Sequence, residues 1–373
     1  MYLFERMLGA ATFFLVLIVA CNSLYVANGK QIKQRLLLYI TALAFLAFIF
    51  IPNRGADLSR LYYALHLYGT MDIYDIARAC SHSSTPVMVI YFWAIGMLRV
   101  DALLPMISCA LFYSLVFSCY WDFAERLKID VKIVALAIFL CMSSGIFFQV
   151  ISNIRSYLAT ALVFRAFYTE QFTGRSPFKN ILYYLVAALF HSFGLALVIL
   201  RVVHICFTNS KNMLQKLIST AFVLLIIFLM MRYGGSYLNA LSDKATDYIA
   251  GESYFYIWEV IIHSLQIAIT VYLLIKLFRI DCTVDQIVRN NLALFIVLIT
   301  MVAVMSLPFD YSIFLRTSVL LSLVSPLVLM LLSSAWSKKE HDCICAVVFT
   351  WSTVSLCLAC ARGDLSSYKF LLL

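Results

Sequence analysis

Long apolar runs recur throughout the 373-residue chain, and they limit its fold more than any other feature. Soluble globular domains contain roughly 45–50% apolar and about 25% charged residues. This chain has 64% hydrophobic and only 13% charged residues. No water-soluble fold of this size could bury so much apolar surface, so a soluble enzyme, a DNA-binding module and a disordered scaffold are excluded. The chain is therefore expected to lie in a bilayer.

The apolar runs predict an all-α fold, a polytopic integral membrane helical bundle that forms one domain over residues 1–373. Six prolines and unbroken apolar segments disfavour a β-barrel, whose strands alternate over about 10 residues. About twelve transmembrane helices are expected, at roughly 20 residues each. Their predicted positions are residues 7–27, 36–51, 102–121, 133–150, 156–170, 180–191, 193–207, 217–232, 257–277, 291–307, 317–335 and 343–361.

A thirteenth apolar stretch, residues 86–98, begins at Pro86 and is too short to span the bilayer comfortably. It is predicted to be a re-entrant or interfacial helix. With this assignment, the short loops that carry half of the 28 basic residues all fall on one side of the membrane. The positive-inside rule places that side in the cytoplasm, so both termini are expected on the outer side. The same rule accounts for the net charge of +9.

The outer side carries the longer polar connections. Residues 52–101 form a first outer loop, which contains the interfacial helix, and residues 233–256 form a second outer loop. Short turns are expected near 151–156, at His191 and at 308–316. Long connections with polar chemistry of their own are often functional, so recognition or catalysis is expected on this face.

The first outer loop contains Arg54, Asp57 and Arg60 at intervals of three residues, followed by Tyr62. If this segment is helical, the three charged side chains share one face. Two interpretations stay open: an exposed ion-pair ladder of little energetic value, or a carboxylate held between two guanidinium groups. In the second, Asp57 stays ionised and acts as a general base, while the two arginines orient it or bind substrate.

Three further polar positions fall on the outer face under the same topology. Asn153 and Arg155 lie at the end of a long apolar run, His191 interrupts another, and Arg316 heads a predicted span. Each has a simpler explanation, since an interfacial arginine can reach the headgroups and a histidine can bond to nearby backbone. Their convergence favours a shared cleft, in which cationic groups suit a phosphate or pyrophosphate.

These motifs, in this order, resemble the EpsG family of bacterial envelope polysaccharide proteins, which is close to the Wzy-type O-antigen and capsule polymerases. The resemblance rests on R-x-x-D followed by Tyr (Arg54, Asp57, Tyr62), N-x-R-x-x-x-A (Asn153, Arg155, Ala159), L-F-H-S (Leu189, Phe190, His191, Ser192) and a late arginine that opens a span (Arg316). It covers most of the chain in order and spacing. Ser156 stands where the family pattern has glutamine after the arginine.

The resemblance implies a polytopic glycosyltransferase with a GT-C-like architecture in the bacterial cytoplasmic (inner) membrane, with its active site facing the periplasm or outside. Such proteins polymerise oligosaccharide repeat units carried on undecaprenyl pyrophosphate, so that donor and acceptor are both lipid-linked. The product is O-antigen, capsule or exopolysaccharide. The implied partners are these lipid-linked units, membrane lipid and a chain-length regulator, but no nucleic acid.

Within this interpretation each candidate residue has a role. Asp57 is the catalytic base, which gives inversion at the anomeric carbon, and Arg155, His191 and Arg316 stabilise the leaving pyrophosphate. The residues expected to bind pyrophosphate or sugar are Arg54, Arg60, Tyr62 and Asn153. No acidic pair on the outer face has metal-binding spacing, so no metal or other cofactor is expected.

Three other classes stay open. A lipid-linked saccharide transporter or flippase would need charges near the bilayer midplane, and its internal repeats are not visible here. A membrane acyltransferase would need a His-x-x-x-Asp motif or another His-centred acid/base pair on a helix, and the sequence shows no such motif. A non-catalytic assembly protein would tolerate loss of the polar residues, which distinguishes it from an enzyme.

Overall fold

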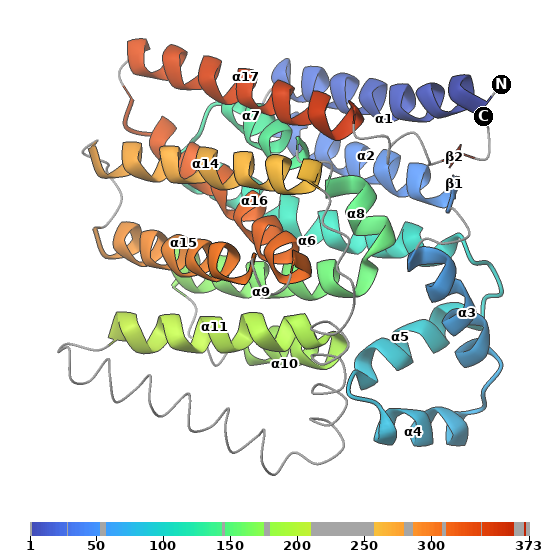
Figure 1. The fold of residues 1–373 in the computed structure, drawn as a ribbon. Coiled ribbons are helices and arrows are strands. Elements are labelled where there is room, and N and C mark those ends of the chain that lie inside the picture. Colours follow the sequence, from blue (N-terminus) through green and yellow to red (C-terminus); the bar gives the residue numbers. More distant parts are fainter. Residues whose placement is uncertain are drawn as a thin grey trace.

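The computed structural model describes residues 2–27, 29–52, 57–143, 146–174, 180–209, 257–279, 286–307, 311–336, 338–361 and 369–370. This described part contains fifteen helices and two short strands. The helices are α1 (Tyr2–Tyr25), α2 (Gly29–Phe48), α3 (Asp57–Gly69), α4 (Ile73–His82), α5 (Pro86–Gly96), α6 (Leu103–Leu127), α7 (Val131–Met142), α8 (Ile146–Ser152), α9 (Ile154–Thr173), α10 (Ile181–Phe190), α11 (Ser192–Asn209), α14 (Ile257–Arg279), α15 (Gln286–Ser306), α16 (Tyr311–Ser333) and α17 (Lys338–Ala361). The chain is an all-α, multi-pass membrane bundle, as the apolar runs predict (Figure 1).

The predicted number of twelve spans is wrong for the described residues. Six of their helices are long and apolar enough to cross a membrane, namely α2, α6, α14, α15, α16 and α17. A seventh span results if α7 and α8, which are bent by 54° relative to each other, count as one. The predicted span at 217–232 and the second outer loop, 233–256, lie outside the described residues.

Length and polarity separate the other helices from spans. α9 has 20 residues, but Arg155, Arg165 and Glu170 give it more charge than a span of that length carries. α10 has only 10 residues, or about 15 Å, which is half of the ~30 Å hydrocarbon core. Apolar runs therefore predict where the helices lie, but they do not reveal how far each helix extends across the bilayer.

α16 lies at the centre of the bundle and packs against α14, α15, α7, α6 and α9. The most apolar part of this helix, 18 residues long, is 89% buried inside the protein. Ser318, Ser322 and Ser325 are completely buried on this helix, and small side chains of this kind let neighbouring helices approach closely. The hydroxyl group of Tyr120 on α6 donates to the backbone oxygen of Leu323 at 2.8 Å, which fixes α6 against α16.

The described residues of the predicted first outer loop form α3, α4 and α5, which gather at one end of the bundle (Figure 1). The stretch predicted to be re-entrant or interfacial is α5, an 11-residue helix that begins at Pro86. α3 and α5 cross at two glycines. A Cβ atom on Gly96 would lie 2.5 Å from the backbone oxygen of Leu65 and 2.9 Å from the Cα of Gly69, so only glycine fits at this crossing.

A short antiparallel pairing brings the C-terminal part of the chain to the same end. β1 (Phe50–Ile51) follows α2 and pairs with β2 (Lys369–Phe370), with Phe50 opposite Phe370. Figure 1 shows this pair beside the α3–α5 segment, whereas the last turn of α14 and the first turn of α15 lie at the opposite end. The bundle thus separates the predicted outer loop from helix ends that adjoin the predicted basic loops.

Candidate functional site

Four separate stretches of the sequence meet around one cavity of about 450 Å³. They are the start of α3, the junction of α8 and α9, the junction of α10 and α11, and the second turn of α16. The lining residues are Asp57, Arg60, Leu61, Ser152, Asn153, Arg155, Ser156, His191, Ser192 and Arg316. Polar and charged side chains therefore dominate this wall of an otherwise apolar bundle.

The break between α8 and α9 exposes the first turn of α9 to the cavity. Only Asn153 separates the two helices, and its backbone leaves the helical region (φ −106°, ψ 43°). The side chain of Gln149 links this junction to its neighbours. Its oxygen accepts a hydrogen bond from the Tyr157 hydroxyl group, and its amide nitrogen lies 3.3 Å from Nε2 of the buried His263. Arg155 consequently lies in the first turn of α9, where it lines the cavity.

The predicted turn at His191 is confirmed. α10 ends at Phe190 and α11 begins at Ser192, while His191 between them is extended (φ −157°, ψ 144°). α11 folds back closely against α10. A Cβ atom on Gly194 would lie 2.1 Å from the backbone oxygen of Ala187, so this hairpin requires glycine at that position.

A hydrogen bond to the backbone of α11 holds the ring of His191 in place. Its Nδ1 accepts a hydrogen bond from the backbone N–H of Phe193 at 3.0 Å. With Nδ1 acting as the acceptor, Nε2 is the ring nitrogen that can donate a hydrogen bond. The bond also satisfies one of the N–H groups at the start of α11, as a capping side chain does. His191 therefore has one ring nitrogen engaged at the start of α11 and lines the cavity beside it.

Asp57 and Arg60 form the ion pair that their spacing predicts, one turn apart at the start of α3. Their side chains are 42% and 75% exposed, so the pair adds little to the stability of the fold. Asp57 is the first residue of α3, where the helix dipole favours a negative charge. The pair is therefore accessible for binding.

The balance of charge in the cavity is positive. Arg60, Arg155 and Arg316 contribute three guanidinium groups, while Asp57 is the one carboxylate in the lining. Among the described residues, no carboxylate lies within ion-pair distance of Arg316. The N-termini of α3, α9 and α11 adjoin the same space and add their partial positive charge. Such an arrangement suits a phosphate or pyrophosphate group.

The cavity thus brings together six of the eight predicted site residues, Asp57, Arg60, Asn153, Arg155, His191 and Arg316. Arg54 lies outside the described residues, and Tyr62 is not part of the lining. Three serines of the lining, Ser152, Ser156 and Ser192, are not among the predicted site residues. Each adjoins a selected residue at a helix end, where hydroxyl groups bond readily to orphan backbone groups or to a ligand.

Tyr62 lies on another side of α3, half-buried and close to Asp101. Burial, and then the charge of Asp101, raise the pKa of the Tyr62 phenol, which therefore stays protonated. Asp101 itself bonds to Nε2 of His66 at 2.6 Å. The predicted contact of Tyr62 with sugar or pyrophosphate stays a prediction.

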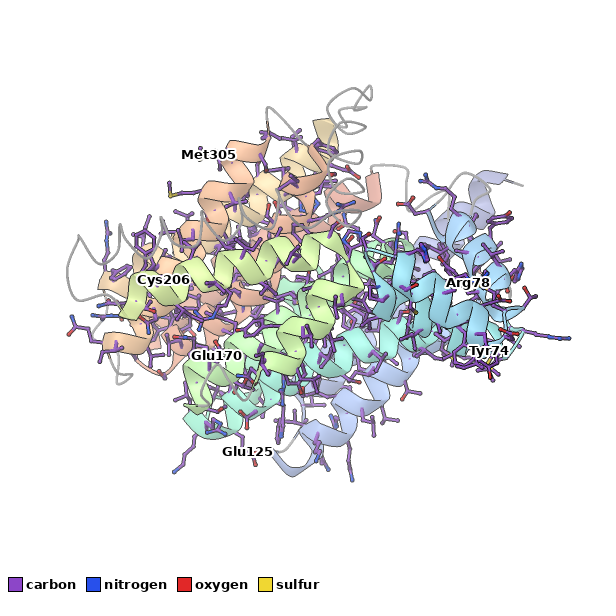
Figure 2. All side chains as sticks on the ribbon, turned by 90° about the horizontal axis from the view of Figure 1, so that it is seen from below. Tyr74, Arg78, Glu125, Glu170, Cys206 and Met305 are labelled. Carbon is purple, nitrogen blue, oxygen red and sulfur yellow. The ribbon has the colours of Figure 1, made fainter. Side chains whose placement is uncertain are left out.

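A second polar cluster lies inside the bundle around Glu170, far from the end where Tyr74 and Arg78 project (Figure 2). Nη2 and Nε of Arg201 donate to Glu170 Oε2 at 2.6 and 3.0 Å. The two side chains are 3% and 2% exposed. The Tyr184 hydroxyl group donates to Glu170 Oε1 at 2.8 Å. Arg201, whose partner the sequence did not reveal, therefore has a structural role that joins α9 to α11.

No family model, curated protein or solved structure matches this chain. The GT-C-like architecture implied by the resemblance therefore has no support from a known fold. The function is accordingly inferred from the residues of the cavity and from the order of their motifs.

Proposed function

We propose that this protein is a glycosyltransferase that polymerises undecaprenyl-pyrophosphate-linked oligosaccharide repeat units on the outer face of the bacterial cytoplasmic membrane. The observation that carries the proposal is the meeting of Arg60, Arg155 and Arg316 with Asp57 and His191 in one cavity. A pyrophosphate is polyanionic, and planar guanidinium groups bind its oxygens through paired hydrogen bonds. The EpsG-like order of the motifs supports the saccharide part of the substrate.

The size of the cavity is compatible with the reacting part of such a substrate. Sites for small molecules usually measure roughly 300–1,000 Å³. A cavity of about 450 Å³ accommodates a pyrophosphate with the sugar attached to it, but not a whole oligosaccharide together with its lipid. The remaining sugars and the polyprenyl chain would therefore extend out of the cavity, into water and lipid respectively.

The proposed reaction exchanges one bond at the anomeric carbon of the donor. The bond from this carbon to the bridging pyrophosphate oxygen breaks, and a bond to the acceptor hydroxyl oxygen forms. Arg155 and Arg316 stabilise the negative charge that develops on the leaving group, and the N–H of His191 adds a hydrogen bond. Asp57 takes the proton of the acceptor hydroxyl group, and lipid pyrophosphate is released. Attack opposite the leaving group inverts the anomeric configuration.

The position of the charges favours this function over transport. A flippase that carries the same lipid-linked unit would need its cationic groups along a path through the bilayer midplane. Here three of the four charged residues of the cavity, Asp57, Arg60 and Arg155, lie in the first turn of a helix, and Arg316 lies in the second. α3, which carries two of them, belongs to the segment at one end of the bundle (Figure 1).

The proposal is tested in a strain that lacks the gene and is complemented with wild type, Arg155→Ala, Arg316→Ala or Asp57→Asn at matched membrane levels. The readout is the ladder of surface polysaccharide on a gel. Wild type should give long chains, and each variant should stop at a single repeat unit. Loss of one group aimed at developing charge lowers a rate by about 10²–10³. Arg126→Ala is the matched control, because Arg126 forms an exposed pair with Asp122 outside the cavity.

Two results would count against the proposal. If the variants build full ladders, the cavity is structural and the protein is an assembly factor. If they expose no repeat unit on the outer face at all, the block lies in transport of the lipid-linked unit. Asp57→Asn is the sharpest variant, since the amide keeps the shape of the side chain and removes the base.

A further inference from the structure

A second cavity, of about 780 Å³, lies between α1, α7 and α17 and shares no residue with the cationic cavity. α1 and α17 both pack against α7, and these helices lie along one side of the bundle (Figure 1). Side chains of all three helices line the groove. Its walls are mainly apolar, with Leu17 and Ile18 from α1, Leu136 and Phe139 from α7, and Phe349 from α17. Ile18 and Phe349 are 62% and 58% exposed, so the groove opens to the surroundings of the bundle.

One end of this groove is polar. Tyr25 lies at the end of α1, Lys132 at the start of α7, and His341 and Asp342 near the start of α17. The ammonium group of Lys132 lies 5.0 Å from the centre of the Tyr25 ring. Asp342 Oδ1 lies 3.3 Å from Nδ1 of His341. The groove therefore combines an apolar body with a rim that carries one lysine and one carboxylate.

The length of the groove corresponds to one leaflet of a bilayer. From Lys132 to Phe139 the wall formed by α7 rises about 10 Å, and from Tyr25 to Phe14 the wall formed by α1 rises about 16 Å. One leaflet contributes about half of the ~30 Å hydrocarbon core. A chain that starts at the rim and lies along these walls therefore spans the depth of an acyl chain in one leaflet.

We propose that this groove binds one membrane phospholipid whose headgroup carries both a phosphate and a primary ammonium group, as in phosphatidylethanolamine. Lys132 pairs with the phosphate, Asp342 accepts hydrogen bonds from the ammonium group, and an acyl chain lies against Leu136 and Phe139. Charge complementarity selects this class of lipid. An anionic glycerol headgroup offers Asp342 no cation, and a choline headgroup has no N–H to donate.

The test uses the full chain, purified in mild detergent and mixed with equal amounts of phosphatidylethanolamine, phosphatidylglycerol and phosphatidylcholine. Native mass spectrometry counts the lipids that stay bound. We expect phosphatidylethanolamine to be retained about tenfold better than either of the others. Lys132→Ala and Asp342→Asn should each lower this retention about tenfold, because each removes a charge-assisted hydrogen bond. Arg126→Ala, which alters an exposed charge outside the groove, should leave it unchanged.

A variant with intact charges separates specific binding from a general effect on folding. Ile18→Trp fills the exposed apolar part of the groove and should abolish retention while the melting temperature without lipid stays near that of wild type. Equal retention of all three lipids, or retention that ignores these substitutions, would indicate ordinary annular lipid and would overturn the proposal. A preference for phosphatidylglycerol would also overturn it, because Asp342 would then take no part.

Discussion

At the scale of single residues, His191 combines two contributions that one substitution can separate. Its Nδ1 accepts from the Phe193 N–H and caps α11, while its Nε2–H is the donor assigned to the leaving group. His191→Asn keeps an acceptor for the cap, so its melting temperature should match wild type while chain elongation falls. His191→Ala should lose elongation and also about 1 kcal/mol of stability. Equal elongation by His191→Asn and wild type would remove His191 from the mechanism.

The buried pair of Glu170 and Arg201 should be the most sensitive charged position in the described part of the bundle. Arg201→Met leaves a carboxylate buried without its cation, which costs about 3–5 kcal/mol. Adding Glu170→Gln removes that charge and keeps an acceptor for Tyr184, so the double variant should melt higher than Arg201→Met alone. Thermal melting in detergent measures the stability of the single and the double variant. The exposed pair of Arg126 and Asp122 offers the control, since Arg126→Ala should lower the free energy of unfolding by at most about 1 kcal/mol. A double variant no more stable than the single one would contradict this account.

At the scale of elements, the crossing of α3 and α5 depends on its two glycines. Gly96→Ala pushes a methyl group into the backbone of α3, and overpacking of this kind costs about 1–3 kcal/mol. Because α3 carries Asp57 and Arg60, the same variant should shorten the polysaccharide ladder. Gly174→Asn is the control: its φ of +66° suits Asn, and nothing lies within 4 Å of an added Cβ. The prediction fails if Gly96→Ala melts and elongates like wild type.

The helix breaks show what the sequence could and could not predict. The turn at His191 was predicted from the sequence. His191 interrupts an apolar run that is too long for one span and too short for two, and the alternation of charge between successive loops required two helices there. The break at Asn153 falls in the short turn predicted near 151–156, but the side chains that hold it could not be predicted, since Tyr157 and His263 come from α9 and α14. Similarly, Arg201 could not be paired from the sequence, because Glu170 lies 31 positions away on another helix.

At the scale of the whole molecule, the sequence predicted the class of fold and the gathering of the polar residues better than the number of spans. Alternate loops of a membrane bundle fall on the same side, so the order of the helices is enough to assign each loop to a side. This assignment places Arg60, Arg155 and Arg316 at one end of the bundle. The number of spans depends on helix length and tilt. The charged α9 is buried among other helices, where protein neighbours rather than lipid satisfy its polar groups. α10 is too short to cross the hydrocarbon core, although several of its apolar side chains are exposed.

The orientation of the bundle is a testable property of the whole chain. One protease site is inserted at Thr70–Asp72, between α3 and α4, and another at Lys128–Asp130, between α6 and α7. Arg126 and Lys132 flank the second position, so the positive-inside rule places it in the cytoplasm. Protease added to intact spheroplasts should cut only the first site, and both should be cut after permeabilisation. If only the second site is cut from outside, the cationic cavity lies at the cytoplasmic face. Polymerisation of units already delivered to the outer face would then be impossible, whatever the cavity binds.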